Sequence, residues 1–299
     1  MFKRILVPLD GSTFAEAALP MAMRLSRRTG ADLELITVHE PIPSFAYDEW
    51  ESAAEEWSIG YLSEVGKRLQ GHTGGAIESV VRSGRVSEAL ARRAEETHVD
   101  LIVMATHGRG ALTRAWLGSV ADAFVRHAPC PVILVRPEEG GPPDLEEEPP
   151  LETILVPLDG SELSEAIVEP ASALAETFGA RLVLLRAVAY PLEIASPYLP
   201  HTVQMNQEIV EEAREAAISY LESAAVTPRE RGIEVEVEAT VDAQAGHAIL
   251  KALEEWKGDL VAMSTHGRGG VARVFLGSAA DKVIRGAHKP VLVFRPESR

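Results

Sequence analysis

Short segments of the residue types that bind phosphate occur twice along this chain. They are ILVPLDGS at 5–12 and 154–161, THGRG at 106–110 and 265–269, and Gly-Ser at 118–119 and 277–278. Glycine lets the backbone approach a phosphate closely, and a Gly-Ser step at a helix start offers N–H groups, a hydroxyl and a favourable dipole. The chemistry that these segments favour is the binding of a phosphorylated ligand.

The elements that must position these segments alternate between strand and helix. Apolar runs predict strands at Arg4–Leu9, Asp32–His39, Ile77–Arg82, Leu101–Ala105 and Val132–Val135. Apolar residues spaced by three and four predict helices at Phe14–Arg28, Glu49–Leu69, Val86–Thr97 and Ser119–His127. Strands that are apolar nearly throughout indicate a parallel sheet with helices on both faces. We therefore expect a doubly wound, five-stranded, Rossmann-like α/β unit in each copy.

The spacing of the repeated segments defines the duplication. The ILVPLDGS segments start 149 residues apart and the THGRG segments 159 apart, so the second copy carries ten extra residues. We expect the extra length around Pro191–Gln207 and in a helix over Gln207–Arg229. The Pro-, Gly- and Glu-rich segment 138–150 cannot bury apolar surface, which predicts a solvated linker. The sequence thus predicts domains over 1–137 and 151–299.

Composition excludes several classes of protein. The 29 Lys and Arg against 45 Asp and Glu give a net charge of -16, which disfavours nucleic acid and acidic membranes as partners. Cys130 is the only cysteine, so the chain has no internal disulfide and no thiolate metal cluster. No run reaches the roughly 20 apolar residues of a membrane span. We expect a cytoplasmic protein.

The order of the segments points to one place in the fold. In open α/β sheets, ligands bind beyond the carboxyl ends of the strands, at the point where the strand order reverses. Pro8, Leu9 and Asp10 end the first predicted strand, and Thr106 follows the fourth. Because parallel strands end at the same edge of a sheet, we expect both segments to face one ligand there.

This combination of motifs resembles the universal stress protein family, here as a tandem pair covering both copies almost entirely. Nucleotide-binding members carry a glycine, two residues, a second glycine, nine residues, and then Gly-Ser or Gly-Thr. The nine residues here are RGALTRAWL between Gly108 and Gly118, and RGGVARVFL between Gly267 and Gly277. The resemblance implies Rossmann-like domains of the adenine nucleotide alpha hydrolase type.

The chain departs from the family pattern at the first glycine. Ala105 takes this place in the first copy and Ser264 in the second. Both are small, so they are compatible with close approach of the backbone to a ligand without requiring it. An interaction module that no longer binds nucleotide therefore stays an alternative.

The resemblance implies a site for ATP, or for ADP or AMP, in each copy. Asp10 and Asp159 would hold the ribose, and Val38 and Ala187 would face the adenine. The glycines would cradle the phosphates. The expected contacts are Pro8, Leu9, Asp10, Val38, Met104, Ala105, Gly108, Arg109, Gly118, Ser119 and Val120 in the first copy. In the second copy they are Pro157, Leu158, Asp159, Ala187, Met263, Ser264, Gly267, Arg268, Gly277, Ser278 and Ala279.

Several of these residues also have structural interpretations. Ser119 and Ser278 each precede an aspartate by three residues, which is the form of a capping box at a helix start. Asp10 has the residue type of a turn. His107 is followed by no recurrent nucleophile or carboxylate, so we expect it to shape its loop. Arg109 would either pair with phosphate or stay solvated.

Three hypotheses for the function follow. The leading one, implied by the resemblance, is a stress-response protein in which ATP occupancy acts as a regulatory switch. The second is a slow ATPase or phosphotransferase, with Asp10 and Asp159 as the candidate ligands for Mg²⁺ or Mn²⁺. The third is the interaction module. We also expect the two copies to pair through Val132–Val135 and Val291–Phe294, as single-domain members of the family dimerise along this edge, with a homodimer as a further assembly.

Overall fold

Strands and helices alternate along both copies in the computed structural model. The structure describes residues 2–40, 47–107, 117–137, 141, 143–146, 148, 150–189, 202–265 and 276–296. The chain divides into two compact units. Unit 1 contains Met1–Pro150 and Pro290–Glu297, and unit 2 contains Leu151–Lys289 and Ser298–Arg299.

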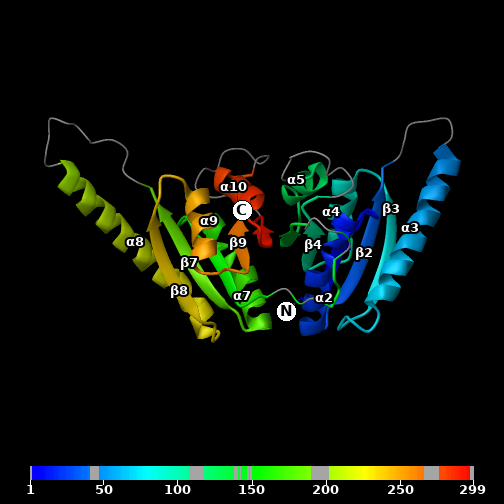
Figure 1. Ribbon diagram of the computed structural model, residues 1–299, viewed down its shortest axis with the longest axis horizontal. Helices are drawn as coiled ribbons and strands as arrows, with labels where there is room; N and C mark the ends of the chain where they lie inside the picture. Colours follow the sequence, from blue (N-terminus) through cyan, green and yellow to red (C-terminus); the bar gives the residue numbers. More distant parts are fainter. Residues whose placement is uncertain are drawn as a thin grey trace. The chain divides into compact units, whose positions relative to one another are not determined.

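Unit 1 is built on strands in the order β3-β2-β1-β4-β5, all parallel, with β10 antiparallel beside β5. Its strands are β1 (Arg4–Pro8), β2 (Asp32–His39), β3 (Ile77–Ser83), β4 (Leu101–Ala105), β5 (Val132–Val135) and β10 (Val291–Phe294). Its helices are α1 (Thr13–Glu16), α2 (Leu19–Thr29), α3 (Tyr47–Leu69), α4 (Val86–Glu96) and α5 (Ser119–Val125). In Figure 1, α3 lies along β3, at the margin of this sheet.

Unit 2 repeats the plan, with strands in the order β9-β6-β7-β8. These are β6 (Thr153–Pro157), β7 (Arg181–Val188), β8 (Val235–Val241) and β9 (Leu260–Ser264). Its helices are α6 (Glu162–Glu165), α7 (Val168–Phe178), α8 (Thr202–Glu230), α9 (Ala245–Glu255) and α10 (Ser278–Gly286). The expected Rossmann-like α/β architecture of two repeats with a mostly parallel sheet is confirmed.

The helix expected over Phe14–Arg28 is in fact two helices, and this expectation was wrong. α1 ends at Glu16 and α2 begins at Leu19. Pro20 is the second residue of α2, where a missing N–H costs nothing, whereas inside a continuous helix it would remove a hydrogen bond and clash with the preceding turn. Unit 2 has the same break between α6 and α7, with Pro170 in the first turn of α7.

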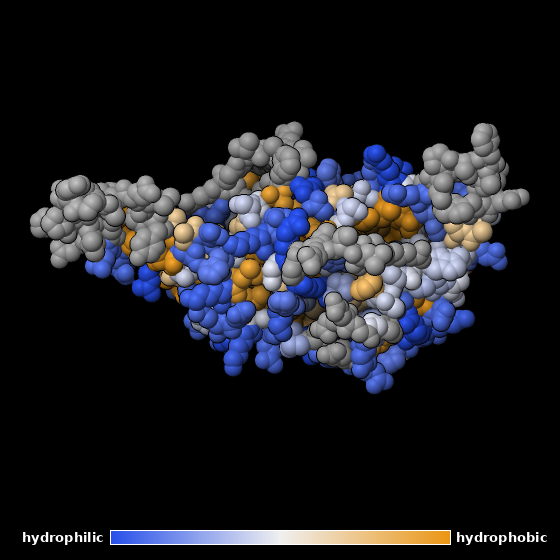
Figure 2. Space-filling view, turned by 45° about the horizontal axis from the view of Figure 1, so that its top comes forward, coloured by the Kyte–Doolittle hydropathy of each residue, from blue (hydrophilic) through white to orange (hydrophobic). Residues whose placement is uncertain are grey.

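Charged and polar side chains cover much of the face seen in Figure 2, with apolar surface in patches between them. Beneath the surface, the inner strands of both units are mostly buried, as the apolar runs predicted. The outer strands are more exposed: β3 buries only Val80, and β8 buries only Val235 and Ala239. Within the described ranges, no helix combines the length and the apolar character needed to cross a membrane.

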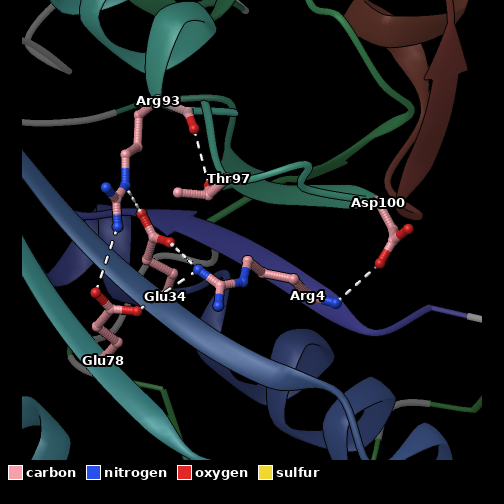
Figure 3. A network of polar contacts seen from close by, with 6 residues as sticks. All are labelled: Arg4, Glu34, Glu78, Arg93, Thr97 and Asp100. Atoms are coloured by element: carbon pink, nitrogen blue, oxygen red, sulfur yellow. Dashed lines mark hydrogen bonds and ion pairs between the residues drawn. The ribbon is translucent and has the colours of Figure 1, made fainter. Parts of the chain in front are cut away.

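A cluster of ion pairs holds the amino edge of the sheet in unit 1 (Figure 3). The Glu34 side chain is only 1% exposed and lies 2.5 Å from Arg93 Nε and 3.3 Å from Arg4 Nη1. Glu78 lies 3.3 Å from Arg93 and 3.6 Å from Arg4. The hydrogen bond to Glu34 raises the pKa of Arg93 above its ordinary value. Four charges therefore link β1, β2, β3 and α4.

Among the described residues of unit 2, the equivalent position has no such ion cluster. By repeat register, the counterparts of Arg4, Glu34 and Arg93 are Thr153, Val183 and Ala252, and all three are buried. In place of the buried glutamate and its two arginines, unit 2 therefore has two apolar residues and a threonine whose hydroxyl accepts a hydrogen bond from Arg181 Nε at 2.9 Å.

An aspartate before the fourth strand of each repeat fastens the start of the first strand; we call this contact the aspartate clip. Asp100 Oδ2 accepts hydrogen bonds from the backbone N–H groups of Lys3 at 2.7 Å and Arg4 at 2.9 Å. Asp259 Oδ2 accepts the equivalent bonds from Glu152 at 2.8 Å and Thr153 at 3.1 Å. The clip ties β1 to β4, and β6 to β9, at the edge opposite the repeated motifs.

Candidate functional site

The repeated motifs meet at the point where the strand order reverses. In unit 1 the chain passes from β1 to β2 and β3 on one side, and from β4 to β5 on the other, while β1 and β4 are paired in parallel. In unit 2 β6 and β9 form the equivalent pair, with Ile154 beside Leu260. In open α/β sheets, a reversal of this kind is the place where ligands bind, outside the carboxyl ends of the strands.

The loop after β1 is shaped by Asp10. Its Oδ1 atom accepts hydrogen bonds from the Ser12 N–H at 2.9 Å and the Ser12 hydroxyl at 2.6 Å. Gly11 between them has φ +79°, a backbone conformation that favours glycine. Ser12 Oγ in turn accepts from Ala15 N and caps α1. The turn interpretation of Asp10 is confirmed, and the turn holds the carboxylate at the carboxyl edge of the sheet.

The equivalent loop of unit 2 makes the same hydrogen bonds. Asp159 Oδ1 accepts from the Ser161 N–H at 2.9 Å and the Ser161 hydroxyl at 2.6 Å, with Gly160 at φ +83°. Ser164 adds a bond that unit 1 lacks, because its hydroxyl accepts from Asp159 N at 3.2 Å. The position that matches Ser164 in unit 1 is Ala15.

The segment after β4 leads directly to the start of α5. Met104 and Ala105 are buried at the end of β4. The Gly118 N–H donates to the Thr106 carbonyl at 2.7 Å, and a Cβ on Gly118 would lie 3.1 Å from that oxygen. A side chain at Gly118 would therefore push the two segments apart. Gly277 repeats the contact with the Thr265 carbonyl at 3.0 Å.

The capping-box interpretation of Ser119 and Ser278 was wrong. The residues that cap α5 and α10 are Gly118 and Gly277, and neither helix has a side-chain cap. The serines are the first helical residues, and their neighbours Val120 and Ala279 follow in the first turn. Asp122 and Asp281, which would complete the boxes, instead pair with Arg126 and Arg285 at 2.7 Å. Uncapped N–H groups at a helix start are suited to an anion.

The ends of β2 and β7 differ between the units. Val38 and Ala187, expected at the adenine, are both partly exposed. Thr37 is buried and donates to the Leu9 carbonyl at 2.9 Å, which fastens β2 to the Asp10 loop. Its counterpart Arg186 lies over the Tyr220 ring, 4.8 Å from the centroid. The Leu158 N–H of unit 2 donates to the Leu185 carbonyl at 2.8 Å, as the Leu9 N–H of unit 1 donates to the Ile36 carbonyl. Pro157 is the last residue of β6, and Pro8 is the last residue of β1.

A tyrosine–glutamate pair beside the first loop was missed at the sequence level. Tyr61 donates to Glu16 Oε1 at 3.0 Å in unit 1, and Tyr220 donates to Glu165 Oε1 at 2.9 Å in unit 2. Burial raises the pKa of both tyrosines, and the glutamates raise it further. The signal was present, because both members recur at the spacings of the repeated motifs. The pairs join α3 to α1 and α8 to α6, and so support the loops.

Four of the expected contacts lie outside the described residues, namely Gly108, Arg109, Gly267 and Arg268. His266 also lies outside them, whereas His107 Nδ1 is 3.0 Å from Thr106 Oγ1. In the part of the chain that the structure describes, three or more His, Cys, Asp or Glu side chains nowhere group in a way that could hold a metal ion. Met263 and Ser264 end β9 as Met104 and Ala105 end β4.

Comparison with known proteins decides the family. The model of the universal stress protein family matches the chain twice, over residues 1–136 and 150–295. The chain belongs to the universal stress protein family. As the sequence analysis expected, it is a tandem member of that family.

The chain is also similar to individual proteins of known sequence or structure. A universal stress protein of Thermus aquaticus is 35% identical over 137 residues, which are 46% of this chain and all of that protein. The crystal structure of a universal stress protein from Archaeoglobus fulgidus covers 98% of this chain and 96% of its own, with 19% identity and a TM-score of 0.66, which shows the same fold. Another solved universal stress protein, in complex with cAMP, is 23% identical and covers 46% of this chain and 98% of its own, with a TM-score of 0.37.

Proposed function

We propose that this universal stress protein binds an adenine nucleotide, ATP or its products ADP and AMP, at the reversal point of each unit. The observation that carries the proposal is the pairing of β1 with β4, and of β6 with β9, beneath an aspartate loop and an uncapped helix start. The loop supplies a carboxylate acceptor for ribose hydroxyls. The helix start supplies N–H donors for phosphate oxygens.

The absence of side-chain caps on α5 and α10 supports the phosphate end of the proposal. Gly118 and Gly277 bring each helix start within hydrogen-bond distance of the backbone that leaves β4 or β9. An added Cβ would lie 3.1 Å from the carbonyl oxygen at Gly118, which is a tight contact, and 3.4 Å from the equivalent oxygen at Gly277. Glycine therefore keeps the two segments close at Gly118 in particular. The four glycine and arginine contacts outside the described residues stay part of the proposed site.

The physiological role that fits is a regulatory switch in the cytoplasm, in which occupancy changes the choice of partner. We keep the domain limits 1–137 and 151–299, the pairing of the two domains through their last strands, and a homodimer as parts of this proposal. Mg²⁺ or Mn²⁺ would enter with the phosphates, as the accompanying ion of the nucleotide.

The test is identification of the small molecules that the purified chain releases on denaturation, by mass spectrometry, followed by calorimetric titration with ATP. Gly118→Glu and Gly277→Glu place a carboxylate at the two helix starts, and each should remove one binding event. Gly60→Glu on α3 is the matched control, because that glycine is exposed and has no atom within 4 Å of an added Cβ. Binding that survives the double Gly118→Glu and Gly277→Glu change, in a folded protein, would contradict the proposed location.

A further inference from the structure

Ser264 is one position at which the two proposed sites differ by a hydroxyl group. It ends β9 and is 7% exposed, and its hydroxyl is buried without a hydrogen-bond partner among the residues that the structure describes. Buried hydroxyls are nearly always paired in folded proteins, because an unpaired one loses its bonds to water without replacement. A hydroxyl kept in this state needs an explanation.

The fold itself does not require the hydroxyl. Ala105 holds the same place at the end of β4 in unit 1 and is 8% exposed, so an apolar methyl group fits there equally well. Serine differs from alanine by one oxygen atom. The added oxygen therefore costs stability in unit 2 and returns no bond within the described part of the protein.

The surroundings of Ser264 indicate what it would bind. The next residue, Thr265, accepts the Gly277 N–H at 3.0 Å, which brings the start of α10 to the end of β9. α10 has nine residues and no side-chain cap, so its first N–H groups and its dipole favour an anion. A hydroxyl donor on the residue that precedes this contact would add to the N–H groups of α10 in binding a phosphoryl oxygen.

We infer that the Ser264 hydroxyl is a specificity-determining donor to a phosphate of the nucleotide in unit 2, which unit 1 lacks. The inference rests on the proposed function and deepens it. The two sites are then chemically distinct: unit 2 recognises the phosphate end of its ligand with one more hydrogen bond than unit 1.

The test uses the full chain with Gly118→Glu, so that titration reports unit 2 alone. Ser264→Ala in this background should weaken MgATP binding about tenfold, the loss of one hydrogen bond to a charged acceptor, and change adenosine binding by less than about twofold. The reciprocal change, Ala105→Ser with Gly277→Glu, should strengthen MgATP binding in unit 1. Without ligand, Ser264→Ala should raise the melting temperature, because the unpaired hydroxyl is gone.

Three results would overturn the inference. MgATP affinity that does not change in Ser264→Ala would show that the hydroxyl does not contact the ligand. Equal losses for MgATP and adenosine would place its partner away from the phosphate. A lower melting temperature without ligand, with unchanged affinity, would show a purely structural hydrogen bond. Failure of the unmodified chain to bind either compound would instead refute the proposed function.

Discussion

Removing the charge of Glu34 should destabilise unit 1 strongly. Glu34→Gln keeps the shape of the side chain but leaves two guanidinium groups beside a neutral amide, at a position that is 1% exposed. Breaking a buried ion pair costs about 3–5 kcal/mol. Arg4 is 32% exposed, and both arginines keep their ion pairs with Glu78. We therefore expect the free energy of unfolding of unit 1 to fall by the lower end of this range, about 3 kcal/mol.

The assay is hydrogen exchange measured by mass spectrometry, with the β7 peptides of unit 2 as an internal reference. A loss of about 3 kcal/mol should speed exchange in β2 by roughly a hundredfold wherever exchange needs global opening of unit 1. β7 should not change, because the cluster lies wholly in unit 1.

A matched variant separates the ion pairs from the packing. It carries the residues of unit 2 at all three positions: Arg4→Thr, Glu34→Val and Arg93→Ala. This variant removes the buried Glu34 together with both of its arginine partners and leaves only Glu78, which is 53% exposed. Removing all the partners of a buried ion pair together is often neutral or stabilising, so the free energy of unfolding should lie within about 1 kcal/mol of that of the unmodified chain. The reasoning fails if it exchanges as fast as Glu34→Gln, or if Glu34→Gln exchanges like the unmodified chain.

Three further outcomes are expected. Burial raises the pKa of Cys130 to about 12, so its thiol should react with a disulfide reagent at pH 8 only as fast as unit 1 opens; reaction at the rate of a free thiol would contradict this. Adenosine should bind unit 1 more tightly than unit 2 by about 1 kcal/mol or slightly more, because Val38 offers a larger apolar contact than Ala187. Equal affinities in calorimetric titrations of the Gly118→Glu and Gly277→Glu variants would contradict this. Hydrolysis of bound ATP with Mg²⁺ or Mn²⁺ should stay below about 1 s⁻¹, and a faster steady-state rate that the double Gly118→Glu and Gly277→Glu change abolishes would favour an enzyme.

Much of the fold could be predicted from the sequence because strands such as β4 and β5 are apolar throughout. The limits of β2, β4 and β5 coincide with the expected ones, and the ends of α3, α4 and α5 differ from them by at most two residues. In the second copy, α8 begins at Thr202, five residues before the expected start at Gln207. The break between α1 and α2 was missed, since Phe14–Arg28 keeps its apolar spacing across the break. Pro20 was the available signal, because a proline in the first turn begins a helix more often than it interrupts one.

The site was predictable in its location and less so in its details. Repetition identified the two loops, and the parallel pairing of β1 with β4 brings them to one edge. The role of Ser119 was misjudged, because a capping box and a glycine-capped helix start share one sequence pattern, and only the backbone of Gly118 separates them. The Tyr61 and Glu16 pair depends on two helices far apart in the chain, which no local pattern reports.

The aspartate clip also has a consequence for the order of folding. Asp100 and the N–H groups that it binds are 96 and 97 residues apart in the chain, and Asp259 bridges 106 and 107 residues. Contacts across such separations close late, because loop-closure entropy opposes them until local structure has formed. Asp100→Ala should therefore accelerate unfolding and leave the refolding rate nearly unchanged. Since the same strand pair underlies the proposed site, a chain emerging from the ribosome would gain a ligand-binding edge only at the last step of forming each unit.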